Sequence, residues 1–289
     1  MDVSVLGFGG AEIGYRGVPN DTVRQLINGA LDAGLNVIDT AECYPGGEEK
    51  IGETVSGRRN EYFLFTKCGH EGISISAGDH WNPRLMAASI DRSLKRLRTD
   101  RVDLLQLHSC SEDHLRIGDV IEVVRRARDA GKTRFIGYSG DGCAALHAVE
   151  SGAFDTLQIS VSIADQEAID LVLPAARARG MGVIAKRPIA NAIWKATTKP
   201  DPYYQEYWAR FQKLSYDFLN GDMAQAVSTA LRFTLSVEGV HTAIVGTTQP
   251  GRWHQNAELL KAGPLNAREF EAIRARWNAV ANPEWVGQT

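Results

Sequence analysis

Four ionisable residues in the first half of the chain are of types that suit proton transfer. Asp39 ends an apolar run, and Tyr44 lies in the polar loop that follows it. Lys67 and His108 each end a later apolar run. A buried Asp needs a partner because an unpaired charge is costly to bury, and Lys67 is the candidate. A positive charge nearby lowers the pKa of a tyrosine, so we expect Tyr44 to donate a proton near neutral pH while His108 orients a substrate oxygen.

The segments that carry these residues alternate between strand and helix patterns along the whole chain. Strands are predicted at residues 3–6, 37–39, 62–66, 102–107, 135–138, 156–159, 182–185 and 242–245. Helices are predicted at residues 21–33, 48–56, 83–97, 117–130, 143–151, 168–179 and 222–236, and from about 250 and 266. The aromatic-rich stretch 191–220 is predicted to be irregular.

Apolar strands that alternate with helices are typical of a parallel sheet covered on both faces. Repeated eight times in 289 residues, the pattern predicts an α/β fold, a closed (β/α)8 (TIM) barrel. A doubly wound open sheet is the alternative. No linker or low-complexity segment interrupts the alternation, so residues 1–289 are predicted to form a single domain. Gly7-Phe8-Gly9-Gly10 lacks the glycine spacing of a dinucleotide-binding loop and is predicted to be a tight turn after the first strand.

In such a barrel, active sites lie at the carboxyl ends of the strands. Asp39, Lys67 and His108 fall at the ends of the second, third and fourth predicted strands, and Tyr44 lies in the loop after the second. Each residue alone has an ordinary structural explanation, since ion pairs at strand ends are common. The prediction of a site therefore depends on all four meeting at one face.

The bulk composition argues against several classes of partner. The 32 basic and 35 acidic residues give a net charge of -3, which offers no electrostatic reason to bind nucleic acid or a membrane surface. No apolar run is long enough to span a bilayer and the start of the chain has no basic signal-like region, so we expect a cytoplasmic protein. The four cysteines do not form a disulfide framework typical of a secreted chain.

Three cysteines lie close in sequence to the four ionisable residues: Cys43, Cys68 and Cys110. With a nearby histidine they could ligate zinc, but they lack the paired spacing of zinc sites. Packing of small polarisable side chains is the favoured interpretation. Inhibition by oxidation remains an alternative.

The chain resembles the aldo-keto reductase superfamily nearly end to end. The resemblance is carried by the motifs VIDTAECY with EEKIG, FTKCG, SLKRLRTDRVDLLQLH, GKTRFIGYSG and IVGTTQPGRWHQN. It implies a catalytic tetrad at the same four positions, Asp39, Tyr44, Lys67 and His108. It also implies hydride transfer from the nicotinamide of NADPH to an aldehyde or ketone, with Tyr44 as the proton donor and no metal.

The resemblance implies cofactor contacts at several strand ends. Ser139 and Gln158 match positions that bind the carboxamide. Gly140 replaces the usual Asn, and Lys186 stands where an aromatic residue usually stacks on the nicotinamide. After the last strand, a helix start typical of phosphate binding is expected. The positions there that match the family are Gly246, Thr247, Thr248, Arg252, Gln255 and Asn256, although the lysine often found at position 246 is missing.

Substrate walls are expected from the loops, with His70, Trp81 and Trp194 as candidates. The aromatic residues near Trp194 could equally form a small core of their own. The favoured function is an NADPH-dependent reductase of a small carbonyl or sugar substrate. One alternative is an NAD-linked sugar or alcohol dehydrogenase, supported by Gly246. Another is a nucleotide-sensing subunit with little turnover, supported by Gly140 and Lys186. The sequence leaves the substrate, the direction and the oligomeric state open.

Overall fold

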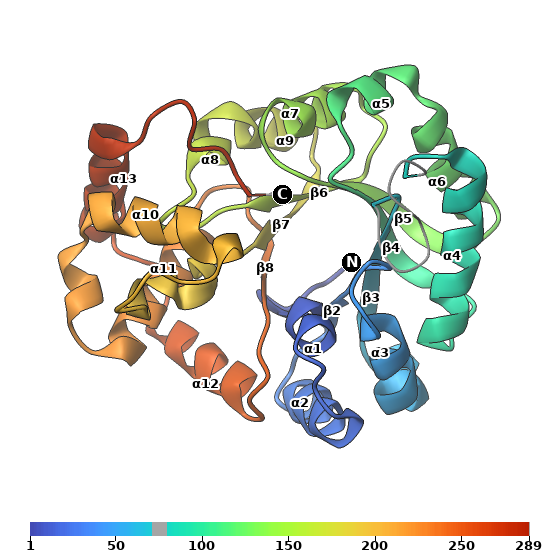
Figure 1. Ribbon diagram of the computed structural model, residues 1–289, viewed down its shortest axis with the longest axis horizontal. Coiled ribbons are helices and arrows are strands. Elements are labelled where there is room, and N and C mark those ends of the chain that lie inside the picture. Colours follow the sequence, from blue (N-terminus) through green and yellow to red (C-terminus); the bar gives the residue numbers. More distant parts are fainter. Residues whose placement is uncertain (71–79, 289) are drawn as a thin grey trace.

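The protein forms a closed barrel of eight parallel strands with helices around its outside (Figure 1). The computed structural model describes residues 1–70 and 80–288. Neighbouring strands follow each other in chain order, and the last strand pairs in parallel with the first. The predicted (β/α)8 barrel is therefore confirmed, and the open sheet is excluded because the edges close.

The strands lie close to their predicted positions, and two of them match the predicted bounds. They are β1 (Leu6–Gly9), β2 (Val37–Asp39), β3 (Phe63–Cys68), β4 (Val102–His108), β5 (Thr133–Ser139), β6 (Thr156–Ser160), β7 (Gly182–Lys186) and β8 (Thr242–Val245). The strand predicted at 3–6 starts three residues later, at Leu6, and the predicted turn is wrong because Gly7 and Gly9 belong to β1. A Cβ on Gly7 would lie 3.0 Å from the Val37 side chain, and one on Gly9 would lie 3.2 Å from the Gly246 nitrogen. Glycine at both positions lets neighbouring strands approach.

The helices cover the outside of the barrel (Figure 1). They are α1 (Ala11–Tyr15), α2 (Asn20–Asp32), α3 (Gly47–Val55), α4 (Pro83–Leu97), α5 (Glu112–Ile117), α6 (Asp119–Asp129), α7 (Gly142–Glu150), α8 (Glu167–Leu171), α9 (Leu173–Ala178), α10 (Gln205–Leu214), α11 (Met223–Ser236), α12 (Arg252–Leu259) and α13 (Ala267–Val280). Short 3-10 helices are η1 (Ser56–Glu61), η2 (Ala190–Lys195), η3 (Pro202–Tyr204), η4 (Asp217–Asn220) and η5 (Leu260–Ala262).

Two helix predictions and one prediction of irregular structure need correction. The helix predicted at 117–130 starts at Asp119, after Gly118 with φ of 85°, and a separate helix that was not predicted, α5, precedes it. The helix predicted at 168–179 is divided at Val172, just before a proline. The stretch 191–220 is not wholly irregular, because it contains α10. The buried side of α10 carries Tyr207, Arg210, Phe211 and Leu214 at helical spacing, but the charge of Arg210 obscures the apolar pattern in the sequence.

Two layers of apolar side chains hold the barrel together. The inner layer contains Val37, Phe65, Leu104, Ile184 and Ile244, which lie inside the barrel. The larger layer lies between the strands and the surrounding helices. Since side chains along a strand alternate between the two faces, residues two positions after an inner-layer residue also point into the barrel.

The chain after α13 returns to the barrel, and Figure 1 shows its end near β6 and β7. Trp285 in this segment packs edge-on against Trp277, with ring centroids 5.4 Å apart. Within the described residues, no helix combines the length and apolar character needed to cross a bilayer.

Candidate active site

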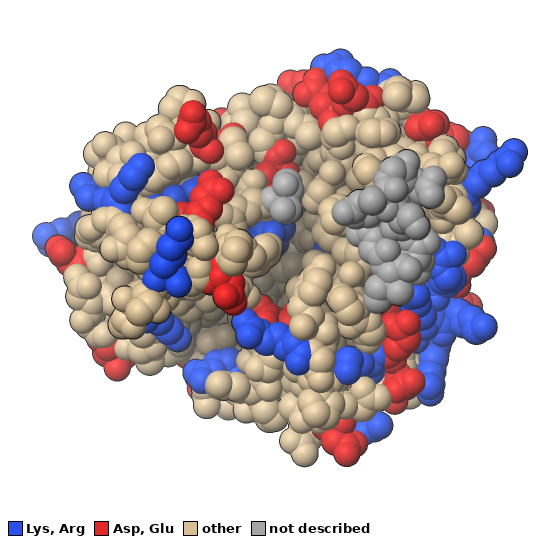
Figure 2. Space-filling view, in the orientation of Figure 1, with Lys and Arg blue, Asp and Glu red and all other residues tan. Residues whose placement is uncertain are grey.

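Strand alternation directs several polar side chains into the carboxyl end of the barrel. Asp39 follows the inner-layer residue Val37 by two positions, and Lys67 follows Phe65 in the same way. His108 continues the inner series of β4. Figure 2 shows the face that carries the C-terminal tail, hollowed at its centre with Lys and Arg atoms on part of the rim. The barrel geometry therefore gathers the predicted residues at one mouth.

Asp39 and Lys67 form the buried ion pair that the sequence predicted. The Nζ atom of Lys67 lies 2.5 Å from Oδ1 of Asp39 and donates a second hydrogen bond to the Thr40 carbonyl at 2.9 Å. The other carboxylate oxygen of Asp39 accepts a hydrogen bond from the Gln158 amide at 2.8 Å. The side-chain amide of Gln106 donates to the same oxygen at 3.5 Å. The surrounding hydrogen bonds compensate for burying the two charges.

Tyr44 lies beside this pair. The Nζ atom of Lys67 is 5.2 Å from the centre of the Tyr44 ring, and the His108 ring meets it edge-on at 5.9 Å. The predicted lowering of the Tyr44 pKa is wrong for the protein without a ligand. Burial raises the Tyr44 pKa well above 10, and the negative charge of Asp39 raises it further. The carboxylate counters the lysine charge, so the phenol keeps its proton.

His108 is held as a neutral imidazole. Burial lowers its pKa well below 6.5, and the charge of Lys67 lowers it further. The Sγ atom of Cys43 lies 3.4 Å from His108 Nδ1. Burial raises the pKa of the Cys43 thiol to about 12, so the thiol keeps its proton and can donate it to Nδ1, an arrangement that places the imidazole proton on Nε2. His108 can therefore offer one N–H to an oxygen in the barrel mouth.

The predicted carboxamide-binding residues join the ion pair. The Ser139 hydroxyl donates to Oε1 of Gln158 at 2.9 Å, while the Gln158 amide donates to Asp39. These side chains are buried. A continuous hydrogen-bonded row therefore runs from β5 through β6 to β2, across the inside of the barrel.

The predicted phosphate segment lies beyond β8. Gly246 and Arg252 are exposed, whereas Thr247 and Asn256 are buried. The helix there starts at Arg252, two residues later than predicted, because Gly251 with φ of 80° precedes it. No side chain caps the start of α12. The Arg252 N–H donates to the Gln249 carbonyl at 3.2 Å, and the next N–H groups of the first turn face outward as donors suited to an anion.

The substrate candidates are spread around the mouth. The His70 and His108 rings lie 5.3 Å apart, so His70 borders the tetrad residues. Trp81 is buried against Gly69 and lies 6.0 Å from the His114 ring. Trp194 packs edge-on against Phe211 at 5.4 Å, which fits the alternative of a local core. Part of the loop after β3, residues 71–79, lies outside the described residues.

Sequence reasoning missed Tyr15 and Glu12, because it did not predict the short helix α1. The Tyr15 ring lies 5.6 Å from the Tyr44 ring and forms part of the mouth. A Cβ on Gly246 would lie 2.7 Å from Cγ of Glu12, so Glu12 occupies the space beside the phosphate segment. Five consecutive residues give too short a window for helical periodicity to be read.

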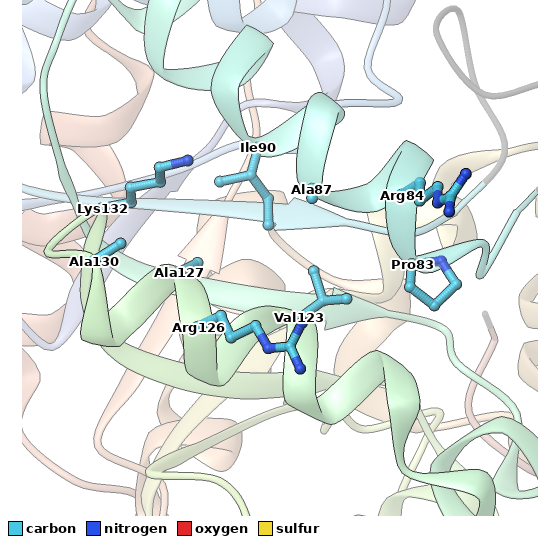
Figure 3. A pocket seen from close by; sticks show the side chains of 9 residues that line it. All are labelled: Pro83, Arg84, Ala87, Ile90, Val123, Arg126, Ala127, Ala130 and Lys132. Atoms are coloured by element: carbon cyan, nitrogen blue, oxygen red, sulfur yellow. The ribbon is translucent and has the colours of Figure 1, made fainter.

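One hollow of the described surface lies away from the tetrad. A groove between α4 and α6 lies outside the barrel and is lined by Pro83, Arg84, Ala87, Ile90, Val123, Arg126, Ala127, Ala130 and Lys132 (Figure 3). Across the part of the chain that the structure describes, no group of three or more His, Cys, Asp or Glu could hold a metal ion.

A family model described as "Aldo/keto reductase family" matches residues 5–278. The chain belongs to the aldo/keto reductase family. It is an NAD(P)H-dependent oxidoreductase with the barrel of that family. The resemblance inferred from the motifs is therefore confirmed.

Two similar curated proteins are sugar dehydrogenases by name. L-galactose dehydrogenase of Arabidopsis thaliana is 26% identical, covering 99% of this chain and 94% of that protein. D-threo-aldose 1-dehydrogenase of a Pseudomonas species is 26% identical over 89% of each protein. Among solved structures, the holo form of aldo-keto reductase AKR11C1 from Bacillus halodurans superposes with a TM-score of 0.81 at 25% identity, covering 98% of this chain and 95% of that one.

Proposed function

We propose that this aldo/keto reductase uses NADPH to reduce an aldehyde or ketone, with Tyr44 as the proton donor. The observation that carries the proposal is the meeting of Tyr44, His108 and the Lys67–Asp39 pair at one barrel mouth. A bound reduced nicotinamide supplies the hydride. The remaining steps are proton transfer and charge stabilisation by the protein's own side chains.

The neutral imidazole of His108 donates a hydrogen bond to the substrate oxygen and positions it. The Tyr44 hydroxyl then gives its proton to that oxygen as negative charge develops there. Lys67 stabilises the phenolate that remains, because its charge lies against the Tyr44 ring. Asp39 fixes the position of Lys67 through the buried ion pair. Each tetrad residue thus has a separate role.

The residues present fit a dinucleotide phosphate. The uncapped start of α12 and the exposed Arg252 offer N–H donors and a positive charge beyond β8. Ser139 and Gln158 carry amide and hydroxyl groups that can bind a carboxamide. We propose that these residues hold the cofactor, together with Lys186, Gly246, Thr247, Thr248, Gln255 and Asn256.

A binding and turnover experiment tests the proposal. The purified protein is titrated with NADPH and with NADH by fluorescence, and then supplied with aldehydes, ketones and sugars while the reduced-nicotinamide absorbance is followed. Tight NADPH binding and carbonyl-dependent oxidation are expected. Binding without oxidation of the cofactor by any compound would favour a sensing role. No binding of either nucleotide would overturn the proposal.

One observation favours an NAD-linked dehydrogenase of a sugar or alcohol as the second candidate. Position 246 is a glycine where the family often has a lysine, so it offers no positive charge to a 2′-phosphate. The acidic Glu12 occupies the adjoining space. A carboxylate there repels a phosphate more than a ribose hydroxyl. A lower Kd for NADH than for NADPH in the same titration, with NAD-dependent oxidation of a sugar, would replace the first candidate.

A further inference from the structure

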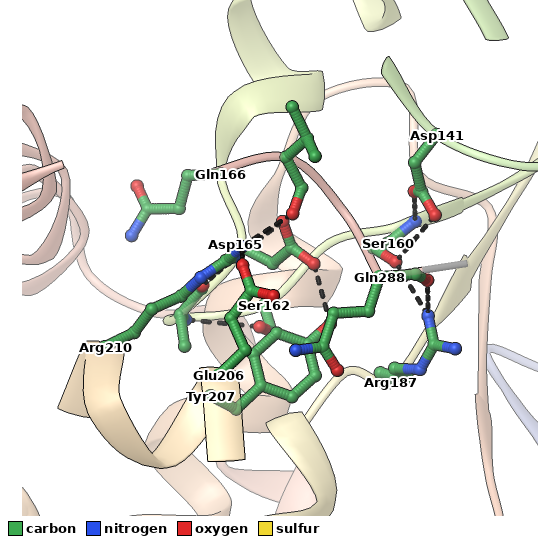
Figure 4. A network of polar contacts seen from close by, with 12 residues as sticks. Asp141, Ser160, Ser162, Asp165, Gln166, Arg187, Glu206, Tyr207, Arg210 and Gln288 are labelled. Atoms are coloured by element: carbon green, nitrogen blue, oxygen red, sulfur yellow. Dashed lines mark hydrogen bonds and ion pairs between the residues drawn. The ribbon is translucent and has the colours of Figure 1, made fainter. Parts of the chain in front are cut away.

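The segment that follows α13 ends on charged side chains at the mouth of the barrel. Residues 281–288, here called the tail, leave α13 and reach β6 and β7 (Figure 1). The Gln288 carbonyl accepts hydrogen bonds from Lys186, at 3.3 Å, and from Arg187 (Figure 4). Lys186 is the last residue of β7, and Arg187 follows it. The tail therefore occupies hydrogen-bond donors at the carboxyl end of this strand.

The tail also contacts the ends of the two preceding strands. A Cβ on Gly287 would lie 2.3 Å from Cγ of Asp141, so the tail backbone packs directly against this carboxylate, which follows β5. Asp141 pairs with Lys186 at 2.7 Å. It also accepts hydrogen bonds from the N–H and the hydroxyl of Ser160, the last residue of β6. The tail is thus joined to the ends of β5, β6 and β7 together.

These three strand ends are where the proposed function places the cofactor. Ser139 ends β5, Gln158 lies in β6 and Lys186 ends β7. A cofactor held by Lys186 needs the donors that the Gln288 carbonyl takes in this structure. It also needs space beside the strand ends, part of which the backbone at Gly287 fills. The end of the tail and the cofactor would therefore compete for one position.

The tail is anchored before it reaches these strand ends. Trp285 is the one buried side chain in residues 281–288, and the Arg210 guanidinium lies 5.5 Å from the centre of its ring. Arg210 also donates to the Val286 carbonyl at 2.6 Å. The Trp285 ring packs edge-on against Trp277 of α13. The tail is therefore fixed as far as Val286 by contacts that do not involve the cofactor position.

The last two described residues of the tail, 287–288, can detach from this anchor. Gly287 has no side chain to bury, and the polar side chain of Gln288 is half-buried. Their release exposes little apolar surface and restores their conformational freedom. The main loss is the pair of hydrogen bonds to the Gln288 carbonyl. Residues 287–288, here called the tail end, are therefore the releasable part of the segment.

The Gln288 carbonyl takes the place of a ligand oxygen. The Lys186 side chain is only 12% exposed, and donors in such a position are costly to leave without an acceptor. In the free protein the tail end supplies that acceptor. A bound dinucleotide would supply carboxamide and phosphate oxygens instead. The donors are thus satisfied in both states, so binding can displace the tail end without leaving a buried group unpaired.

We propose that residues 287–288 are an autoinhibitory segment, which occupies the cofactor position in the free protein and is displaced when the nicotinamide cofactor binds. This inference rests on the proposed function, since it takes Lys186 as a cofactor contact. A closed tail end lowers the apparent affinity for the cofactor in proportion to the fraction of molecules that are open. Removal of the tail end should therefore tighten cofactor binding. A tail that clasps the bound cofactor would have the opposite effect.

Two variants test the sign of this effect. A chain that ends at Val286 lacks the tail end but keeps the anchor on Arg210. Gly287→Ala places a Cβ at the 2.3 Å contact with Asp141 and so pushes the tail end away. Gly29→Ala adds the same atom in α2, where nothing lies within 4 Å, and is the matched control.

Fluorescence titration with NADPH gives the Kd of each protein. Both tail variants should bind at least tenfold more tightly than the unaltered protein, as expected if fewer than about one molecule in ten is open. The control should bind like the unaltered protein. An equal or higher Kd in the shortened chain would overturn the inference and leave the proposed function standing. No nucleotide binding by either protein would overturn the proposed function, and the inference with it.

A nitroxide spin label on residue 288 reports the displacement directly. Gln288→Cys keeps the backbone carbonyl that makes the contact, and Cys143→Ser removes the exposed native thiol. At saturating NADP⁺, the electron paramagnetic resonance spectrum should show a more mobile label. An unchanged or less mobile label would overturn the displacement, whatever the Kd values are.

Discussion

Lys67 and Asp39 hold each other inside the barrel, with Nζ 2.5 Å from Oδ1 and neither side chain more than 2% exposed. The pair joins β2 to β3 and places a positive charge against the Tyr44 ring. Neither partner can be removed without leaving a buried charge. The same contact therefore matters for stability and for the proposed chemistry.

Removal of one partner should destabilise the protein strongly. Lys67→Met leaves Asp39 without its cation and should lower the free energy of unfolding by about 3–5 kcal/mol. The double variant Asp39→Asn with Lys67→Met should recover part of this loss, because no unpaired charge is left. Urea unfolding measures both. The exposed pair of Arg126 and Glu122 is the control, and Arg126→Met should cost less than about 1 kcal/mol. If Lys67→Met and Arg126→Met lowered the free energy of unfolding by similar amounts, this account would be contradicted.

Tyr44→Phe should separate binding from chemistry. The variant loses only the hydroxyl, so the ring contacts with Lys67 and His108 can remain. Turnover should fall at least 100-fold, in line with the loss of a positioned proton donor. The Kd for the cofactor, measured by fluorescence, should stay within about twofold. Retained turnover with lost cofactor binding would contradict the proton-donor role.

The rate of carbonyl reduction should change little between about pH 7 and 9. Tyr44 must be protonated to act, so its raised pKa keeps it active until the pH exceeds that value. His108 must be neutral, so its lowered pKa keeps it active until the pH falls below that value. Single-turnover reduction at saturating cofactor gives the profile. A rate that falls steeply between pH 7 and 8 would show that the phenol ionises far more easily than its burial indicates.

The sequence predicted the barrel because strand ends and helix caps leave local signals. Asp222 caps α11, the helix predicted at 222–236. The helix predicted at 83–97 is α4, and Asn82 caps it. The tetrad followed from the same logic, since parallel strands bring their carboxyl ends to one face. What sequence could not supply was the balance of opposing effects on Tyr44. The lysine charge was visible in the pattern, whereas the depth of burial depends on the whole fold.

The missed elements have a physical explanation. Glycines in β1 are poor strand formers, and only the closeness of β2 and β8 favours them there. Arg210 interrupts the apolar face of α10. It is buried there because it donates hydrogen bonds to the Asp165 carboxylate and to the Val286 carbonyl. The tail that reaches Arg187 is placed by such tertiary contacts and leaves no periodic signal.

Cys43 should resist alkylation despite its contact with His108. Burial raises its thiol pKa to about 12, so the reactive thiolate is scarce at pH 8. Cys68 and Cys110 are buried as well, whereas Cys143 is exposed. Iodoacetamide should therefore label Cys143, and Cys143→Ser should abolish labelling of the folded protein. Mass spectrometry of digests locates the label. Labelling of Cys43 together with loss of activity would instead support the oxidation-sensitive alternative.

Cofactor preference should depend on Gly246 and Glu12 together. Gly246→Lys restores a cation at the position where the family often has lysine, but its Cβ would lie 2.7 Å from Cγ of Glu12. The single variant must displace Glu12, whose carboxylate then competes for the new ammonium group. Little change in the ratio of the Kd values for NADH and NADPH is expected from it.

The double variant Gly246→Lys with Glu12→Ala removes both the contact and the competing carboxylate. The ammonium group is then available to a 2′-phosphate, and the Kd for NADPH should fall at least tenfold relative to that for NADH, which corresponds to about 1.4 kcal/mol. Glu12→Ala alone serves as the control for the lost carboxylate. Fluorescence titration of all four proteins with both nucleotides gives the ratios. An unchanged ratio in the double variant would mean that the 2′-phosphate lies away from Gly246, and the placement of the cofactor beyond β8 would have to be abandoned.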